Sequence, residues 1–400
     1  MGLRSIHPLR SLRAARGLTQ EHLAEVLQRD VSTIKRWEAG KTVPSARTQW
    51  EVARVLAVPM EHLGFGKAAV SVRSPEEGGL AGAEEVVELA RRAERSVVGS
   101  GTIESIEQAV DRFSRSYATT SPLALLPAVT QRFRYVVGLL DQKLTLAQHR
   151  QLLVAGGWCA LLLAALHFDV GQREAAQASR DAAHQLGKEG GHSGIAGWAF
   201  ETGAWFALAD GRYREAVDLA RAGHAIADPG SAPRVAAMVQ EARATARIGD
   251  RPGTEAALGR AELEIERMAP VQRPDSQFAF DLPKLSFYAA TSWIWLNDPG
   301  RAADHANRVL RENGCAAGRN HWPTRVATMQ VELGLAALQR DEVEEAVHLG
   351  SVALGGPFLR RSTIWRAEEL DRGLLRAAPA SRDVLDFHEL LLLQRVAVEE

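Results

Sequence analysis

The feature of this 400-residue chain that most constrains its fold is a set of residues that recurs after 40 positions. The recurring pairs are Gly157 and Gly197, Trp158 and Trp198, Ala164 and Ala204, Gly171 and Gly211, Ala176 and Ala216, Ala182 and Ala222, and His184 and His224. A second step of 40 reaches Ala244 and Ala256. A fixed period of about 20–50 residues indicates repeats that bury their apolar faces by stacking on one another. We therefore predict a stacked array in the body of the chain.

One repeat unit indicates how the chain folds back on itself. Residues 195–209 and 214–227 have helical patterns, and the segment 210–213 between them contains Gly211, which tolerates the positive φ of a tight reversal. Ala204 and Ala216 are small enough for the two helices to approach closely. Helical patterning continues from about residue 84 to the C-terminus, without a run typical of a strand. We predict an all-α body over residues 84–400.

This unit resembles a tetratricopeptide repeat, in which a small residue, a turn glycine, a tyrosine, an alanine and a closing proline recur. Similar turns follow at residues 249–250, 297–300 and 340–341, with Ala256, Ala302 and Ala346 after them. The resemblance implies an α-solenoid whose first helices line a concave surface for a partner. Carried over at the 40-residue spacing, these surface positions are Trp158, Trp198 and Met238, then Glu201 and Glu241, then Trp205. We expect this aromatic and acidic strip to bind an effector; the alternative is that it packs between repeats.

The first 65 residues have a different pattern. A helical pattern from Pro8 ends at Gly17, and Thr19 and Asp30 are placed to cap a second and a third helix. In the third helix, Ile34 and Trp37 point inward together. The outer face then carries Val31, Ser32, Lys35 and Arg36.

This outer face has the side chains that read bases in the major groove of DNA. The fork of Arg36 suits O6 and N7 of guanine, Val31 suits a thymine methyl, and Ser32 and Lys35 supply further polar contacts. For the phosphate backbone we expect Gln20, Thr33, Lys41 and Arg47. Residues 1–66 hold ten basic and six acidic residues, a net +4, which leaves −5 for the rest of a chain of net charge −1. A basic head on an acidic body is typical of a nucleic-acid footprint confined to one end.

The runs 18–25, 32–40 and 44–45 of this head resemble the XRE (phage-repressor-like) helix-turn-helix family. The resemblance implies five helices, the last two over Trp50, Ala53 and Leu56 and over residues 59–63. It also implies a structural pair between Arg13 and Glu38, and a homodimer on a two-part operator of double-stranded DNA. The chain departs from the family at residues 28–29, where Gln-Arg replaces the usual Gly-Val.

The predicted organisation is a head over residues 1–65, a linker over 66–83 and the helical body over 84–400. Cys159 and Cys315 are the only cysteines and support neither a disulfide framework nor a zinc site. No signal peptide, membrane span, phosphate-binding loop, dinucleotide fingerprint or nucleophile elbow is evident. We therefore expect a cytoplasmic protein that is not an enzyme, needs no cofactor or metal, and does not bind a membrane.

The combination resembles the peptide-responsive quorum-sensing regulators of Gram-positive bacteria and similar regulators of actinobacteria. It implies a sequence-specific transcriptional regulator whose body senses a peptide or small-molecule effector. Asparagines, which clamp peptide backbones in such proteins, are absent from the effector positions named above, so a small hydrophobic or cationic ligand is an equal alternative. The rival functions are a DNA-tethered interaction scaffold and an antitoxin-like autoregulator whose body binds a protein.

Overall fold

The computed structural model describes residues 7–56, 58, 60–65, 98–270, 274–314, 322–356 and 358–399, without the side chains of 46, 47, 60, 61, 100, 313, 314 and 399. Every regular element in these described segments is a helix, which confirms the predicted all-α fold. Contacts between Cα atoms divide the chain into two compact units, Met1–Gly82 and Ala83–Glu400. The linker predicted over residues 66–83 lies outside the described residues.

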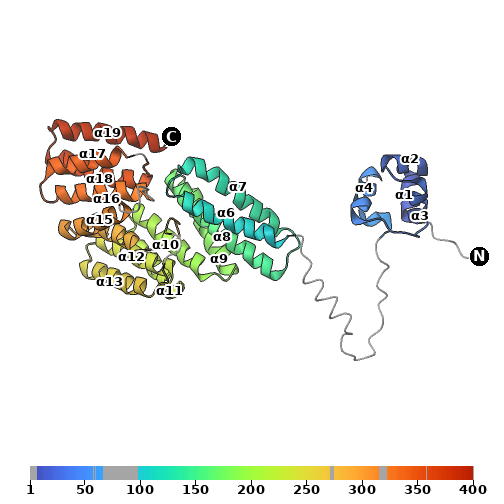
Figure 1. Ribbon diagram of the computed structural model, residues 1–400, viewed down its shortest axis with the longest axis horizontal. Coiled ribbons are helices and arrows are strands. Elements are labelled where there is room, and N and C mark those ends of the chain that lie inside the picture. Colours follow the sequence, from blue (N-terminus) through green and yellow to red (C-terminus); the bar gives the residue numbers. More distant parts are fainter. Residues whose placement is uncertain are drawn as a thin grey trace, which may run out of the picture. The chain divides into compact units, whose positions relative to one another are not determined.

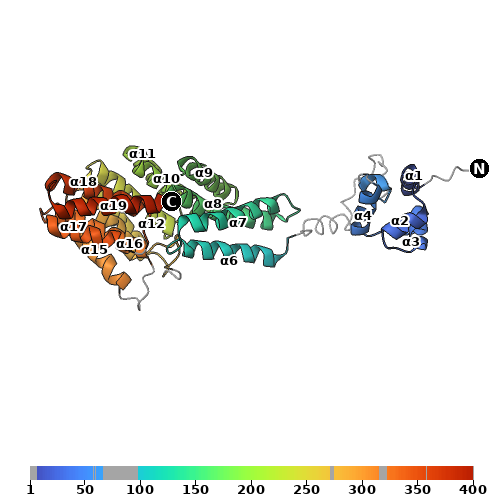
Figure 2. The same ribbon diagram turned by 90° about the horizontal axis from the view of Figure 1, so that it is seen from above.

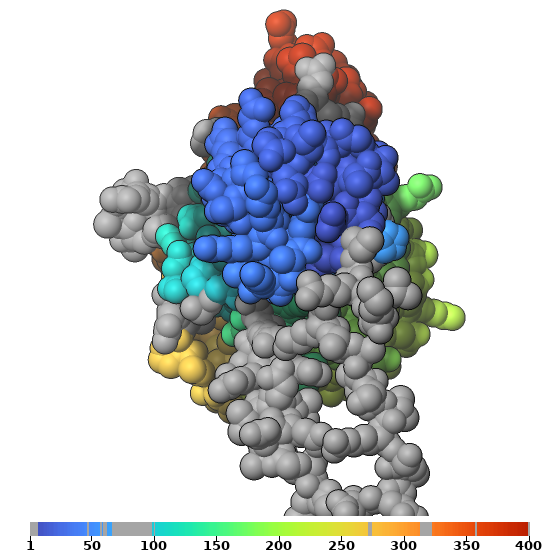
Figure 3. Space-filling model, turned by 90° about the vertical axis from the view of Figure 1, so that its right-hand side faces the viewer, coloured from blue at the N-terminus to red at the C-terminus, as the bar shows by residue number. Residues whose placement is uncertain are grey.

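The described residues of the head form four α-helices and a 3₁₀-helix around a small apolar core (Figure 1). The helices are α1 (Pro8–Ala15), α2 (Gln20–Val26), α3 (Val31–Glu38), α4 (Ala46–Leu56) and η1 (Met60–Leu63). Leu9, Leu23, Ile34, Val52, Leu56 and Leu63 are fully buried at its centre. In the space-filling view, the blue atoms of the head lie packed together on the face that is shown (Figure 3).

The first three helices of the head end in the same way. Gly17, Gln28 and Gly40 have φ of 66°, 53° and 66°. The residue after each donates its N–H to the carbonyl five residues earlier, for example Arg29 to Ala24 at 2.8 Å. This 6→1 hydrogen bond satisfies a helix carbonyl that would otherwise lack a partner. Gln28 adopts this conformation without being a glycine, at a cost of roughly 1–2 kcal/mol.

The body is a succession of antiparallel helix pairs (Figures 1 and 2). Its described part begins with α6 (Ser100–Ser116) and α7 (Pro122–Leu140). The pairs are then α8 (Leu146–Asp169) with α9 (Arg173–Glu189), α10 (Ser193–Ala209) with α11 (Tyr213–Ile226), α12 (Ala232–Arg247) with α13 (Arg251–Glu266), α14 (Leu282–Trp295) with α15 (Pro299–Gly314), α16 (Pro323–Leu338) with α17 (Val343–Leu354), and α18 (Arg361–Ala377) with α19 (Arg382–Glu399). The first helices of successive pairs pack side by side from α8 to α18. This is the repeat-like body that the 40-residue period predicts.

The register of the pairs is set by one left-handed residue in each tight turn. Gly171, Gly211, Gly249, Asn297 and Asp341 all have φ between 54° and 77°. They are 40, 38, 48 and 44 positions apart, so the 40-residue period holds only for the first step. The buried residue five positions after Gly249 is consequently Thr254, fully buried, whereas the predicted Ala256 is exposed. That register prediction was wrong by two residues, because α11 and α12 (14 and 16 residues) are shorter than α9 and α10 (17 residues each) by more than the longer loop between them restores.

Helix α8 is long and apolar enough to cross a membrane by length and composition, although the sequence was expected to contain no such span. In the structure, 72% of its most apolar window is buried inside the protein. Its hydrophobic residues cover all sides, as in a helix enclosed by other helices. Cys159 lies on this helix and is fully buried, which raises the pKa of its thiol to about 12. The apolar character of α8 therefore reflects its place in the core of the body.

Candidate DNA-reading helix and cavity of the body

Helix α3 is held in the head by its inner face and leaves its outer face to solvent. The carboxylate of Asp30 caps the helix by accepting the N–H of Ser32 at 2.7 Å. Ile34 and Trp37 are buried, at 0% and 5% exposure. Four residues were expected to read bases. Ser32, Lys35 and Arg36 are exposed, and Val31 is half-buried. Neither Lys35 nor Arg36 forms an ion pair within the described segments, so both can reach an anionic surface.

The inner end of α3 is fixed by a buried carboxylate. Arg13 on α1 donates from Nε to Oε1 of Glu38 at 2.5 Å and from Nη2 to Oε2 at 3.2 Å. Gln20 on α2 donates from Nε2 to Oε2 at 2.5 Å. Burial opposes ionisation of Glu38, but the bonds from Arg13 and Gln20 outweigh it and hold the pKa of the carboxyl below its usual value. One carboxylate thus ties α3 to both preceding helices.

Of the four residues expected to contact the phosphate backbone of DNA, the three whose side chains the structure describes differ in how far they are exposed to solvent. The side-chain amide of Gln20 is engaged by Glu38, so it does not face outward as the sequence analysis expected. The reason is that Oε2 of Glu38 accepts a second, shorter bond from Gln20 besides the 3.2 Å bond from Arg13, and this draws the amide inward. Thr33 is half-buried on α3, and Lys41 is exposed just after Gly40. Arg47 lies in α4, but its side chain is outside the described part of the structure.

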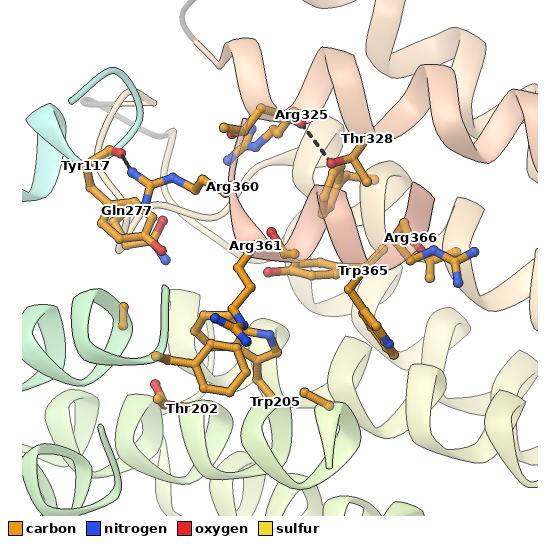
Figure 4. Close-up of a pocket in the computed structure, with 18 of the residues that line it drawn as sticks. Tyr117, Thr202, Trp205, Gln277, Arg325, Thr328, Arg360, Arg361, Trp365 and Arg366 are labelled. Carbon is orange, nitrogen blue, oxygen red and sulfur yellow. Dashed lines mark hydrogen bonds between the residues drawn. The ribbon is translucent and has the colours of Figure 1, made fainter. Parts of the chain in front are cut away.

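The body contains a partly open cavity of about 290 Å³, lined by Tyr117 just after α6 and by residues from α8, α9, α10, α12, α14, α16, α18 and α19 (Figure 4). Its walls are mainly aromatic and cationic: eight arginine and lysine side chains line it, against the two carboxylates of Glu201 and Glu368. In the close-up, Arg361 extends from the start of α18 towards Trp205 on α10, and Trp365 points into the same space (Figure 4). Arg360 instead turns to Tyr117, the residue after α6.

Three of the six residues expected to bind an effector line this cavity, namely Trp198, Glu201 and Trp205. The other three do not. The centre of the Trp158 ring lies 4.7 Å from that of Phe278. Met238, on α12, is buried in the hydrophobic core of the body.

Glu241 faces the opposite side of α12 from the cavity. It accepts hydrogen bonds from Arg221 at 2.8 Å and Arg260 at 2.7 Å, and it lies 3.4 Å from His224. Although burial opposes ionisation, these partners lower the pKa of Glu241 to about 2. The 40-residue carry-over that placed it on the same surface as Glu201 was wrong, because the true step from Gly211 to Gly249 is 38 residues. Two extra residues turn a helix position by about 200°, to the opposite face.

The same register identifies a cavity residue that the sequence analysis missed. Trp205 lies six residues before Gly211, and Arg243 lies six residues before Gly249. Both line the cavity. Aligning the repeats on their turn glycines, rather than on a constant period, would have placed Arg243 in the same column as Trp205.

The ionisable groups of the cavity wall are buried and unequally paired. Glu201 accepts a bond from Gln240 at 2.8 Å, and burial raises the pKa of its carboxyl. Lys284 donates to the carbonyls of Gln277 and Ala279, both at 2.9 Å. Burial and the nearby Arg325 lower the pKa of Lys284 to about 7. The wall described as aromatic and acidic from the sequence is therefore aromatic and predominantly basic.

Comparison with known proteins addresses the head alone. A family model described as a helix-turn-helix domain matches residues 7–63. A search of curated proteins found no match. The match covers α1 to η1, and with the exposed outer face of α3 it supports a DNA-binding regulator.

Proposed function

We propose that this chain is a sequence-specific transcriptional regulator, with an XRE-type head that reads operator DNA and a tetratricopeptide-like body that senses a small molecule. The observation that carries the DNA-reading half is the two-sided character of α3. Ile34, Trp37 and Glu38 fix one side in the head, while Lys35 and Arg36 face solvent on the other. A helix fixed in this way presents its side chains to the major groove at a set depth.

In this proposal, Arg36 is the principal base reader. Its guanidinium donates two parallel hydrogen bonds to O6 and N7 of a guanine, a pairing worth about 1–3 kcal/mol of discrimination against another base. Lys41 neutralises a phosphate, and the N-terminus of α2 faces the backbone. A homodimer would present two such helices to a two-part operator, with half-sites about one helical turn apart.

The sensing half of the proposal is supported by the cavity in the body. Helices from six successive repeats contribute to its wall, so a molecule bound there would contact elements that are far apart in the sequence. A ligand that binds one curvature of the array more tightly than another shifts the population of molecules towards the curvature it prefers. The size of this shift is set by the difference between its affinities for the two curvatures. In a dimer, that shift changes the separation of the two heads and hence the affinity for the operator.

The test is selection of bound sites from a random pool of double-stranded DNA by the full chain, at one fixed salt concentration because phosphate contacts weaken as salt rises. We expect a two-part motif that Arg36→Ala relaxes at one position of each half. Arg54→Ala on α4 is the matched control, since Arg54 is also exposed but lies on another helix, and it should leave the motif unchanged. A motif unaffected by Arg36→Ala, or no motif at all, would contradict the proposal.

A further inference from the structure

The cavity of the body carries more buried positive charge than its own carboxylates balance. Arg243, Lys284 and Arg325 are 7%, 5% and 6% exposed, and all three line the wall. The acidic groups near them are Glu201, which is 6% exposed, and Asp281, whose Oδ1 lies 3.8 Å from Arg325. When Lys284 is protonated, three cations thus have only two carboxylates near them, one of them on the wall and the other beside it.

Two other arginines of the wall are already neutralised. Arg366 donates from Nε and Nη2 to the two oxygens of Glu332 at 2.6 and 2.7 Å. Arg360 contacts the buried carboxylate of Asp169. In contrast, no carboxylate oxygen of the described residues lies within 4.0 Å of Arg243 or Lys284.

Arg243 also has a buried donor without a partner. Its Nη1 donates to Oε1 of Gln240 at 3.0 Å, but its Nε has no hydrogen bond among the described groups. The guanidinium lies 5.2 Å from the centre of the Tyr288 ring and 5.5 Å from that of Trp295. Buried polar groups in folded proteins are nearly always hydrogen-bonded, so this donor is free to bind either a water molecule or a polar group of a ligand in the cavity.

The remaining wall suits an apolar body. The indole rings of Trp198, Trp205, Trp322 and Trp365 and the ring of Phe278 line the cavity. Its volume of about 290 Å³ is at the lower end of the range for small-molecule sites. That size admits one or two fused rings.

We propose that this cavity binds a small aromatic carboxylate, whose acid group is held by Arg243 and Lys284 and whose rings pack against Trp198 and Trp205. A single carboxylate supplies the one negative charge that the group of buried cations lacks, and it accepts the hydrogen bonds that an arginine offers. A cationic ligand would add to the excess positive charge. The inference deepens the sensing half of the proposed function, but binding is measured without DNA and so succeeds or fails independently of operator recognition.

The test is isothermal titration of the full chain with three probes that share one ring system: 2-naphthoate, 2-naphthamide and 2-(aminomethyl)naphthalene. We expect naphthoate to bind at least tenfold more tightly than the neutral amide, and the cationic amine to bind more weakly than both. Equal affinity for naphthoate and the amide, tighter binding of the amine, or no binding of naphthoate would overturn the proposal. This comparison uses the unmodified protein and does not depend on a variant that folds.

Variants then locate the acid group. Arg243→Met keeps the length of the side chain and removes its charge, and it should abolish the preference for naphthoate over the amide. Lys284→Gln should reduce the same preference, and it serves as the second variant if Arg243→Met does not fold. Arg382→Met is the matched control, because Arg382 is exposed on α19 outside the cavity. An unchanged preference in the folded Arg243 and Lys284 variants would contradict this assignment.

Discussion

Arg13 and Glu38 lie 25 residues apart in the sequence and are joined side chain to side chain by two hydrogen bonds, at 2.5 and 3.2 Å. The side chain of Glu38 is only 3% exposed and that of Arg13 is 12% exposed, so water screens this pair weakly. Arg13 also donates to the carbonyl of Leu18 at 2.6 Å, in the turn that leads to α2. The pair therefore fixes the angle of α3 and the path of the chain between the first two helices.

The first prediction concerns this pair. Arg13→Ala leaves the Glu38 carboxylate buried with only Gln20 as a partner, and breaking a buried pair in this way costs about 3–5 kcal/mol. Because Arg13 is partly exposed, we expect roughly 2–4 kcal/mol of local stability to be lost from the head. The measurement is hydrogen exchange of peptides that cover residues 31–38. Arg10→Ala, an exposed arginine on the same helix, should change protection little, and equal effects of the two variants would contradict the structural role of the pair.

The turn before α3 gives the second prediction. Gln28 has a φ of 53°, a conformation that costs a side-chain-bearing residue roughly 1–2 kcal/mol. Gln28→Gly removes this cost but adds freedom to the unfolded chain, so we expect a gain of less than about 1 kcal/mol. Gln28→Val should lower stability by about 1–2 kcal/mol, since a β-branched residue tolerates positive φ poorly. The free energy of unfolding of the head is measured for both variants by hydrogen exchange at increasing urea concentration. A valine variant more stable than the unmodified chain would contradict the positive φ assigned to Gln28.

The helices of the head were predictable because their signals are local. Thr19 accepts the N–H of His22 at 3.1 Å and Asp30 that of Ser32, as expected of caps. The burial of Ile34 and Trp37 follows from their spacing of three residues. The partner of Gln20 could not be found in this way, because it depends on how three helices converge on one carboxylate.

In the body, the existence of a repeat was predictable and its register was not. The turns keep a left-handed residue, but its identity changes from glycine to Asn297 and Asp341, and the distance between turns varies. A constant period therefore places Glu241 on the wrong face of α12. The cavity depends on contacts that span most of the body, such as that of Arg360 with Tyr117, 243 residues earlier. No local pattern carries such information.

The third prediction concerns the buried pair of Arg366 and Glu332. Glu332 is 0% exposed, and it also accepts a bond from Thr291 at 3.0 Å. Arg366→Met leaves this carboxylate without its cation and should lower the free energy of unfolding by about 3–5 kcal/mol. The double variant Arg366→Met with Glu332→Leu should recover most of that loss, because neither charge then remains buried. Urea unfolding followed by circular dichroism gives both values, and a double variant less stable than the single one would refute the account.

The last prediction is a pH dependence that arises from Lys284. The charged groups facing it are Arg325, Glu201 and Asp281, and burial with Arg325 lowers the pKa of its ammonium from 10.5 to about 7. Between these two values the unfolded chain holds a proton that the folded chain lacks, so the contribution of Lys284 to the unfolding free energy rises with pH in that interval. It is least favourable below pH 7, where the buried ammonium is charged.

Urea unfolding of the body at pH 6.5, 8 and 9.5 measures this effect. The slope of stability against pH should be smaller in Lys284→Met than in the unmodified chain, and Lys188→Met, a more exposed lysine on α9, should leave the slope unchanged. The same protonation governs the proposed carboxylate site. An anion stabilises the charged ammonium, so the affinity for 2-naphthoate should fall as pH rises above 7, while that for 2-naphthamide stays constant. A naphthoate affinity that is constant from pH 6.5 to 9.5 would show that Lys284 does not contact the acid group, and would leave Arg243 as its only ligand.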